Sequence, residues 1–308
     1  MLIGHQTIKH YFDQARENAS LAQAYCLVGP SQVGKRTLAY SVAADLLQIS
    51  FDKVHTHPDF YFVEREVDPK TGKRKRDISV AQARDLRSRC QRRSWSGGYQ
   101  VVVVDEVELL NTEAGNALLK ILEESPVQTV VFLLTENDDV LLPTIKSRCQ
   151  LFYIPLVTNE VLTAGLQATG AYTEGAIQKA VELAAGRPGR AILALTNEEW
   201  LTRYEGEKKR WQSLLSVPFF QKIAATEEWF KESAGIERDA LDEILSWWVE
   251  WWRSALLETV RGTVPQAGSS VTSPQQAQVI IDAVQHCRRF LRQNVNARLA
   301  LENVFLLF

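Results

Sequence analysis

One short segment restricts the possible folds of this chain more than any other feature. Residues 29–35 read Gly-Pro-Ser-Gln-Val-Gly-Lys, the G-x-x-x-x-G-K spacing of a phosphate-binding loop. In such a loop, Gly29 and Gly34 let backbone N–H groups turn inward around an anion at the start of a helix, Pro30 lies within the turn, and Lys35 reaches the outer phosphates. The motif requires a strand before it and a helix after it, so it predicts an α/β fold.

The surrounding sequence supplies both elements and repeats them. Short apolar runs rich in β-branched residues alternate with amphipathic helical patterns through the first half of the chain. This alternation is typical of a parallel sheet covered by helices on both faces. The expected strands are 24–28, 60–63, 100–104, 129–135 and 150–154, and the expected helices are 35–47, 79–92 and 111–124.

Strand signals stop after Pro155, and the rest of the chain reads as helical. Two helical periods, 158–169 and 173–185, precede the breaker Gly-Arg-Pro-Gly at 186–189 and a third short helix. A stretch rich in Gly, Ser, Thr and Pro at 262–274 predicts a flexible connector. We therefore expect an α/β domain at 1–155, a small helical lid at 156–198 and an all-α domain at 199–308.

The metal side of the phosphate loop departs from the usual pattern. The position after Lys35 normally carries a Ser or Thr hydroxyl that binds Mg²⁺, but here it is Arg36, and Thr37 comes one residue late. One residue along a helix turns the side chain by about 100°, so Thr37 does not replace the missing hydroxyl. Because a guanidinium repels Mg²⁺, we expect the loop to persist as a fold element, with ATP or ADP binding left open. Competent hydrolysis is the alternative.

An acidic pair follows the next apolar strand. Asp105 and Glu106 come directly after four valines, where a working ATPase would hold Mg²⁺ through the aspartate and orient the attacking water through the glutamate. An ordinary acidic strand end is the alternative, although the order of the pair after the phosphate loop speaks against it. The sequence therefore keeps both carboxylates of the acidic pair but lacks the Ser or Thr hydroxyl that would bind Mg²⁺.

Composition narrows the cellular context. The chain carries 35 Lys and Arg against 37 Asp and Glu, and its formal net charge is −2, so overall charge does not predict a nucleic-acid partner. Its four cysteines are scattered, without the spacing of a metal knuckle or redox pair. No leader pattern and no apolar run of membrane-spanning length are visible. These observations predict a cytoplasmic protein.

Longer motifs connect these features to a known family. The chain resembles the clamp-loader branch of the AAA+ superfamily, and within it the delta-prime type of bacterial DNA polymerase III subunit. The run Asn-Ala-Leu-Leu-Lys-Ile-Leu-Glu-Glu at 116–124 and the Ser-Arg-Cys at 147–149 are the most specific matches. Weaker matches are Gly-His-Gln at 4–6, Gly-Lys-Arg at 34–36, His-Pro-Asp at 57–59, Val-Asp-Glu at 104–106 and the Leu-Leu-Pro-Thr-Ile-Lys that precedes 147.

The resemblance implies a role for one arginine and a set of partners. Arg148 would be an arginine finger, given in trans to the ATP of an adjacent subunit, where a guanidinium stabilises the charge on the transferring phosphoryl group. A simple ion pair at a strand edge is the alternative. The implied assembly is a nucleoid-associated hetero-pentamer with gamma/tau-like ATPases and a delta-like wrench subunit, which loads a sliding clamp on primed DNA. The domain at 199–308 would be its oligomerisation collar.

Departures from the family pattern indicate a helper subunit. Relatives usually carry a four-cysteine zinc module, but residues 48–58 contain no cysteine, so we expect no zinc and no other metal. ATP-hydrolysing relatives place an arginine three residues after the glycine equivalent to Gly186. Here that position is Gly189, with Arg190 one step later. Thr135 ends its strand where relatives carry a γ-phosphate sensor, although a threonine is also ordinary there.

Some basic and aromatic residues remain outside these motifs. Lys120 would face the ring interior in the resembling proteins and could touch a DNA phosphate, although an exposed helical lysine is usually only solvated. The predicted hairpin tip carries a second set of DNA-binding candidates, which could equally be a solvated loop: Lys73, Arg74, Lys75 and Arg76. Tryptophans at 247, 248, 251 and 252 form one wide helical face, for which helix packing is the preferred interpretation over base stacking.

Together these observations favour a clamp-loader subunit that supplies Arg148 and hydrolyses little or no ATP itself. An ATP-hydrolysing gamma/tau-like subunit that tolerates Arg36 is one alternative. A DNA-binding adaptor with a vestigial phosphate loop is the other.

Overall fold

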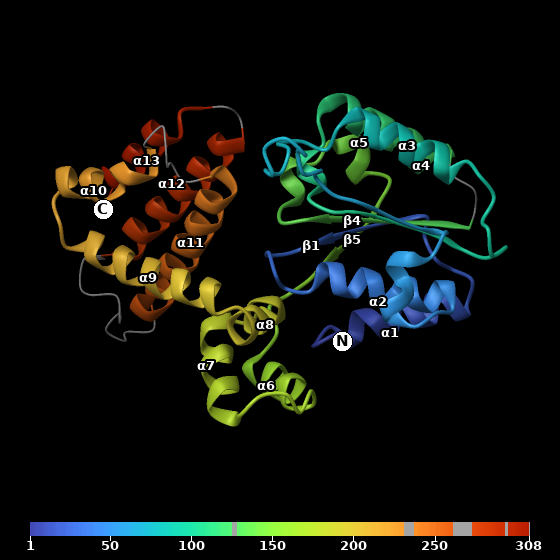
Figure 1. Cartoon of the computed structure of the whole chain (residues 1–308), viewed down its shortest axis with the longest axis horizontal. Coiled ribbons are helices and arrows are strands. Elements are labelled where there is room, and N and C mark those ends of the chain that lie inside the picture. Colours follow the sequence, from blue (N-terminus) through green and yellow to red (C-terminus); the bar gives the residue numbers. More distant parts are fainter. Residues whose placement is uncertain (125–127, 231–236, 261–272, 293–294, 308) are drawn as a thin grey trace. The chain divides into compact units, whose positions relative to one another are not determined.

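The computed structural model describes residues 1–124, 128–230, 237–260, 273–292 and 295–307 (Figure 1). The chain divides into two compact units, Met1–Glu198 and Glu199–Phe308, and each is described by itself. The predicted connector at 262–274 lies outside the described residues, apart from its last two positions. Among the described helices, none is both long and apolar enough to cross a membrane.

The first unit is built on a five-stranded sheet in the order β2-β3-β4-β1-β5, and every neighbouring pair is parallel. The strands are β1 (Ala24–Val28), β2 (Phe60–Val63), β3 (Gln100–Val104), β4 (Thr129–Thr135) and β5 (Gln150–Tyr153). The α/β prediction is confirmed, because apolar runs between helices formed a parallel sheet in which the central strands are buried on both faces.

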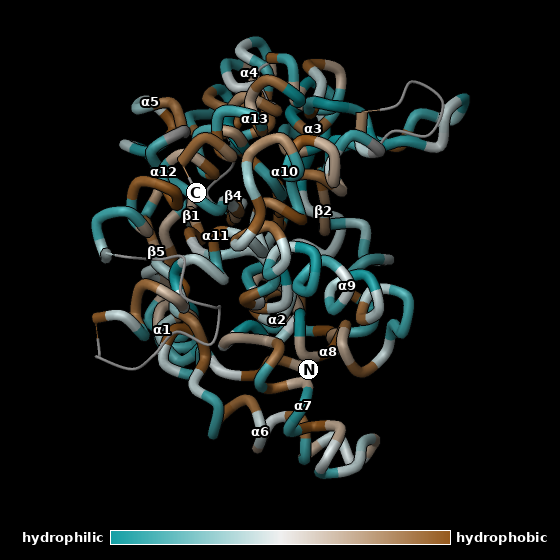
Figure 2. The backbone as a smooth tube through the Cα atoms, turned by 90° about the vertical axis from the view of Figure 1, so that its left-hand side faces the viewer, coloured by the Kyte–Doolittle hydropathy of each residue, from teal (hydrophilic) through white to brown (hydrophobic). Residues whose placement is uncertain are grey.

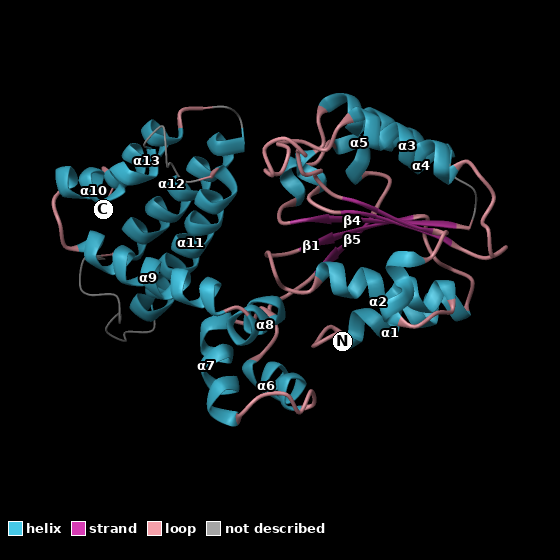
Figure 3. Ribbon diagram, in the orientation of Figure 1, coloured by secondary structure: helices cyan, strands magenta, loops and turns pink. Residues whose placement is uncertain are grey.

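Helices cover both faces of this sheet (Figure 3). On one side lie α1 (Gln6–Glu17) and α2 (Lys35–Leu47), and on the other lie α3 (Val80–Cys90), α4 (Thr112–Glu124) and α5 (Pro143–Lys146). Alternation along β3 serves both cores: Val101 and Val103 join the cluster with α2, while Val102 and Val104 join the cluster with α3 and α4. Short 3₁₀ turns occur at Phe51–Thr56, Val107–Leu109 and Asp138–Val140.

A small helical group completes the first unit. It consists of α6 (Asn159–Gln167), α7 (Glu174–Ala184) and α8 (Pro188–Thr196), which share an apolar cluster with Ile3 and Val157. The turn between α7 and α8 depends on Gly186, which has φ +79° and whose Cβ would lie 2.8 Å from the Val157 carbonyl oxygen. Pro188 then starts α8 at a position that needs no N–H donor.

The second unit is entirely helical among its described residues. It contains α9 (Glu198–Leu215), α10 (Phe219–Thr226), a 3₁₀ turn (Glu227–Phe230), α11 (Arg238–Val260), α12 (Pro274–Arg292) and α13 (Ala297–Phe305). The hydropathy colouring in Figure 2 shows α9 as largely hydrophilic, so its attachment to α11 depends on a few aromatic side chains. These are Trp200, Tyr204 and Trp211, all of which are buried.

The tryptophan-rich face of α11 forms the centre of this unit. Trp247 packs edge-on against Tyr204 with ring centroids 5.0 Å apart, and Trp252 meets Trp211 at 5.5 Å. Trp248 contacts Phe305 of α13 at 5.9 Å. The four α11 tryptophans have at most 7% of their surface exposed. Their face therefore packs helix against helix within the unit, which leaves no ring free for base stacking.

A carboxylate is buried among these rings. Glu207 on α9 has 6% of its surface exposed, and its Oε1 accepts a hydrogen bond of 3.1 Å from Trp248 Nε1. Arg210 Nε lies 3.6 Å from the other carboxylate oxygen. Burial dominates over both partners and raises the pKa of Glu207 to about 7.

This raised pKa predicts a pH-dependent stability of the helical unit. The folded state binds the Glu207 proton more tightly than the unfolded state, so stability is highest below pH 4.5 and falls as pH rises to about 7. The loss is roughly 3 kcal/mol at about 1.4 kcal/mol per pKa unit. Glu207→Gln keeps the Trp248 acceptor but removes the charge, so it should flatten this dependence.

Urea unfolding at pH 5 and pH 8 measures the effect through tryptophan fluorescence, since seven of the eight tryptophans lie in the second unit. If wild type and Glu207→Gln lose equal stability between these pH values, Glu207 does not carry the proton linkage.

Candidate functional site

The loop between β1 and α2 has the geometry that its sequence predicts. Gln32 and Gly34 adopt left-handed conformations with φ 61° and 111°. A Cβ at Gly29 would lie 2.6 Å from the Ile154 carbonyl oxygen, so only glycine fits where the loop passes β5. His5 Nε2 contacts the Val33 carbonyl oxygen at 2.9 Å and supports the loop from the start of the chain. These constraints fix the backbone for inward-facing N–H groups.

Lys35 is folded back over the loop. Its Nζ donates to the carbonyl oxygens of Gly29 at 2.6 Å and Pro30 at 2.8 Å, and 9% of the residue is exposed. Burial lowers the pKa of Lys35 from its usual value. The ammonium group is thus positioned at the loop, as the motif predicts, with its hydrogen bonds directed to the protein.

The start of α8 packs directly on this loop. Gly189 N donates to the Gln32 carbonyl oxygen at 2.9 Å, and a Cβ at Gly189 would also lie 2.9 Å from that oxygen. Arg190 is buried and its Nε lies 3.4 Å from the Gln32 side-chain oxygen. The position where the resemblance predicts an arginine in hydrolysing subunits is therefore a close backbone contact here, which accommodates only glycine.

Arg36 occupies the acidic side of the site. Its Nε and Nη2 donate to Asp105 Oδ2 at 2.9 and 2.6 Å, and Nη2 also donates to Glu64 Oε2 at 3.1 Å. The guanidinium carbon lies 4.6 Å from the ring centroid of Phe62. Two carboxylates and an aromatic face thus hold this cation in place.

The second carboxylate of the acidic pair is also engaged. Glu106 accepts from Arg65 Nε at 3.0 Å and Nη2 at 3.3 Å, and Arg65 itself is buried. Arg74 reaches the same network, with nitrogens 3.7 Å from Glu64 and 3.9 Å from Glu106. The sequence had shown an intact Asp-Glu pair, but the structure shows both carboxylates neutralised by arginines of the same chain.

These side chains do not fit Mg²⁺, which takes six oxygen ligands in near-ideal octahedral geometry. Asp105 Oδ2 is bound by Arg36, and Asp105 Oδ1 accepts the Glu106 N–H at 2.9 Å, so both oxygens already have partners. Thr37, half-buried in the first turn of α2, lies one helical position away from the missing hydroxyl. Elsewhere in the described chain, no group of three His, Cys, Asp or Glu residues could hold a metal ion.

Thr135 lies next to the loop, at the end of β4. Its backbone oxygen accepts from Gly29 N at 3.1 Å, and the residue is 1% exposed. The hydroxyl donates to the Asn137 carbonyl oxygen at 3.0 Å, so it closes a local turn. The structure brings Thr135 to the site, and its sensor role stays a prediction.

Arg148 lies at the other end of the sheet. It precedes β5, whose first residue pairs with Tyr25 near the start of β1, whereas the phosphate loop follows the end of β1. The five residues of β1 separate the two ends by about 16 Å at ~3.3 Å per residue. Its side chain is 38% exposed and contacts Glu123, in the last turn of α4.

The DNA-binding candidates differ in their surroundings. Lys120 is exposed on α4, and no ion pair involves it among the described residues. The basic segment is a hairpin tip with an antiparallel bridge between Val67 and Arg74. There, Lys75 pairs with Glu66 at 2.7 Å and Arg74 turns back to the acidic network. The DNA role of both stays a prediction.

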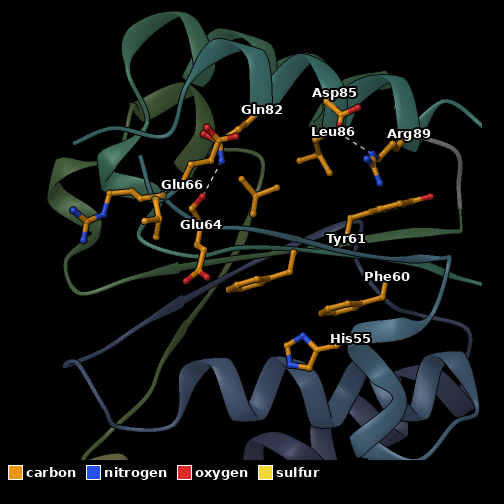
Figure 4. Close-up of a pocket in the computed structure, with 13 residues that line it drawn as sticks. His55, Phe60, Tyr61, Glu64, Glu66, Gln82, Asp85, Leu86 and Arg89 are labelled. Atoms are coloured by element: carbon orange, nitrogen blue, oxygen red, sulfur yellow. Dashed lines mark hydrogen bonds and ion pairs between the residues drawn. The ribbon is translucent and has the colours of Figure 1, made fainter. Parts of the chain in front are cut away.

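A groove of about 540 Å³ runs along the outer edge of β2 (Figure 4). Gln82 and Arg89 of α3 line one side and His55 the other, and Gln82 Nε2 donates to the Glu64 carbonyl oxygen at 2.8 Å. The groove adjoins the arginine–carboxylate network but none of its lining residues belongs to the phosphate loop. No sequence motif predicts this groove, because its walls come from separate elements.

Strand order, phosphate loop and helical group define the first unit as a P-loop domain of the AAA+ type. The match of a family model narrows this class. The family DNA polymerase III, delta subunit, matches residues 4–158, and the chain belongs to this family.

Individual relatives agree with the family match. DNA polymerase III subunit delta-prime of Escherichia coli is 29% identical over 264 residues, which cover 82% of this chain and 74% of that protein. The delta-prime subunit of Pseudomonas aeruginosa is 37% identical over 152 residues, 45% of this chain and 44% of its own length. The predicted delta-prime resemblance is confirmed by these relatives.

A solved structure has the same fold. A DNA polymerase III gamma subunit-related protein from Thermotoga maritima superposes with a TM-score of 0.50 at 16% identity, over 98% of this chain and 97% of that one. At this identity the likeness concerns the fold alone.

The arginine–carboxylate network predicts the effect of Arg36→Thr, which restores the usual G-K-T sequence. The change frees Asp105 and Glu64 and adds the missing hydroxyl, so the variant should bind Mn²⁺ at least ten times more tightly than wild type, about 1.4 kcal/mol. Isothermal titration with MnCl₂ measures this, with Arg36→Lys as the control that keeps the charge. Equal Mn²⁺ affinity of Arg36→Thr and wild type would show that Arg36 does not exclude the metal.

Proposed function

We propose that this chain is a clamp-loader subunit of the delta-prime type, which donates Arg148 to the ATP of a neighbouring ATPase subunit and does not hydrolyse ATP itself. Family membership supports the clamp-loader role. The Arg36–Asp105 ion pair at 2.6 Å is the main observation in favour of a subunit that assists hydrolysis in a neighbour without hydrolysing ATP itself. It removes the metal ligand from one end of the domain, while Arg148 stays exposed at the other.

The chain's own site is a poor ATPase on chemical grounds. Hydrolysis requires Mg²⁺ between the β- and γ-phosphates and a free carboxylate to orient water. Arg36 binds Asp105, and Arg65 binds Glu106, so neither carboxylate is available without breaking a charge-assisted hydrogen bond. The phosphate loop then serves to hold β1, α2 and α8 together. ATP or ADP binding there is dispensable for the proposed role, and no zinc takes part in it.

Arg148 suits a role in trans. Its position before β5 puts it about 16 Å from its own loop, beyond the reach of an arginine side chain, so a phosphate that it contacts belongs to another chain. A guanidinium placed on a transferring phosphoryl group accelerates the reaction by about 10³ to 10⁵. Leu142, an exposed apolar residue at the start of the short helix whose Thr144 contacts Arg148, suits a protein interface around it.

The proposed partners follow from this role. The chain would join gamma/tau-like ATPases and a delta-like subunit in a hetero-pentamer that loads a sliding clamp on primed DNA. Its second unit would act as the collar. The aromatic core of that unit is satisfied internally, so ring contacts would be made by exposed side chains such as Phe220, Val279 and Leu299.

Substitution of the finger tests the proposal. In a complex reconstituted with a gamma/tau-type ATPase and a delta-type subunit, Arg148→Ala should lower the turnover of the ATP site it faces by at least about 10³, because the developing phosphoryl charge loses its partner. The amplitude and rate of the phosphate burst, measured in the pre-steady state with DNA present, report the turnover of that site. Arg84→Ala, an exposed arginine on α3, is the matched control.

Size-exclusion chromatography confirms equal assembly of all variants. If the assembled Arg148→Ala complex releases phosphate with the same burst as the wild-type complex, the finger role is refuted.

A further inference from the structure

The Arg148 guanidinium is held from two sides, although its side chain is exposed. Its Nη2 contacts Glu123 Oε1 at 2.6 Å, and its Nη1 donates to the Thr144 carbonyl oxygen at 2.9 Å. Glu123 belongs to the last turn of α4, and Thr144 to the four-residue helix α5. Two different elements therefore determine where this side chain points.

The two elements are fixed relative to each other. Leu142, at the start of α5, packs so closely on Gly115 of α4 that an added Cβ would lie 3.2 Å from Leu142 Cδ1. Ile145 of α5 is 2% exposed and shares the core cluster with Leu118 and Leu122 of α4. Because Ile145 and the α4 leucines are buried and apolar, α4 and α5 hold Glu123 and Thr144 as a frame around Arg148.

The frame leaves part of the guanidinium available. Arginine carries five N–H donors in a planar fork, and the contacts to Glu123 and Thr144 use two of them. An exposed ion pair contributes little to folding stability. Its effect is instead to select one orientation of a long, flexible side chain before any phosphate arrives, and preorganised charge is what accelerates phosphoryl transfer.

We infer that Glu123 is a positioning residue for Arg148: it holds the guanidinium in the orientation in which the remaining N–H groups meet a neighbour's phosphate. The inference rests on the proposed function. Adjacent Glu124 has no such task, since it pairs with Arg87 of α3 at 2.7 Å. One helix turn thus offers two glutamates of similar exposure, 48% and 49%, with different arginine partners.

A double-mutant cycle in the reconstituted complex tests this role. Glu123→Ala should lower kcat of the affected site about tenfold without changing KM for ATP, because binding is untouched and orientation is lost. Glu123→Gln keeps an oxygen acceptor and should retain an intermediate kcat. Glu124→Ala is the control and should match wild type. In the Arg148→Ala background, Glu123→Ala should cause no further loss, since it acts through Arg148.

Each result decides between the two proposals. If Arg148→Ala lowers kcat but Glu123→Ala does not, or if Glu123→Ala lowers kcat equally in both backgrounds, the positioning role is wrong and the finger remains. If Arg148→Ala leaves kcat unchanged, both are wrong. Assembly and thermal stability of Glu123→Gln, the milder change, show that any loss is not one of folding.

Discussion

The proposed role of this P-loop domain depends on the ion pair between Arg36 and Asp105. The Arg36 guanidinium also binds Glu64, which follows β2, and lies over the ring of Phe62. Two charge-assisted hydrogen bonds, of 2.9 and 2.6 Å, join Arg36 to the same oxygen of Asp105 and orient the guanidinium toward it. The phosphate loop, its lysine and the acidic pair of an ATPase are all present, but both carboxylates form ion pairs with arginines of the same chain.

The phosphate loop and the proposed arginine finger lie at opposite ends of the same sheet. The phosphate loop still joins β1 to α2 and receives the start of α8 through Gly189. The sheet carries Arg148 at its opposite end, on a frame that α4 and α5 build from buried apolar contacts. In the proposed role, the domain serves as a holder for one exposed guanidinium.

Much of the fold could be predicted from the sequence because its signals are local. The strands at 24–28, 60–63, 100–104 and 129–135 were predicted at their observed bounds, and the helices agree within a few residues. Buried parallel strands appear in the sequence as short apolar runs, and amphipathic helices appear as apolar residues at helical spacing. The i, i+4 spacing of the α11 tryptophans likewise predicted one packed face.

The candidate site was less predictable, since its key contacts join distant residues. Arg36 lies 69 positions from Asp105, and Arg65 lies 41 positions from Glu106, with no periodic pattern linking either pair. The sequence indicated that Arg36 opposes a metal, but not that Arg65 and Arg74 would also neutralise the acidic cluster. Arg74 was expected to be a solvated or DNA-binding residue, and its contact with Glu64 appears only in three dimensions.

The most direct test of this account is ATP turnover by the purified chain alone in the presence of Mg²⁺. The Arg36–Asp105 pair predicts a rate at background level, the same as that of Lys35→Ala. Measurable Mg²⁺-dependent hydrolysis that Lys35→Ala abolishes would contradict it, because the acidic pair would then be serving a metal after all.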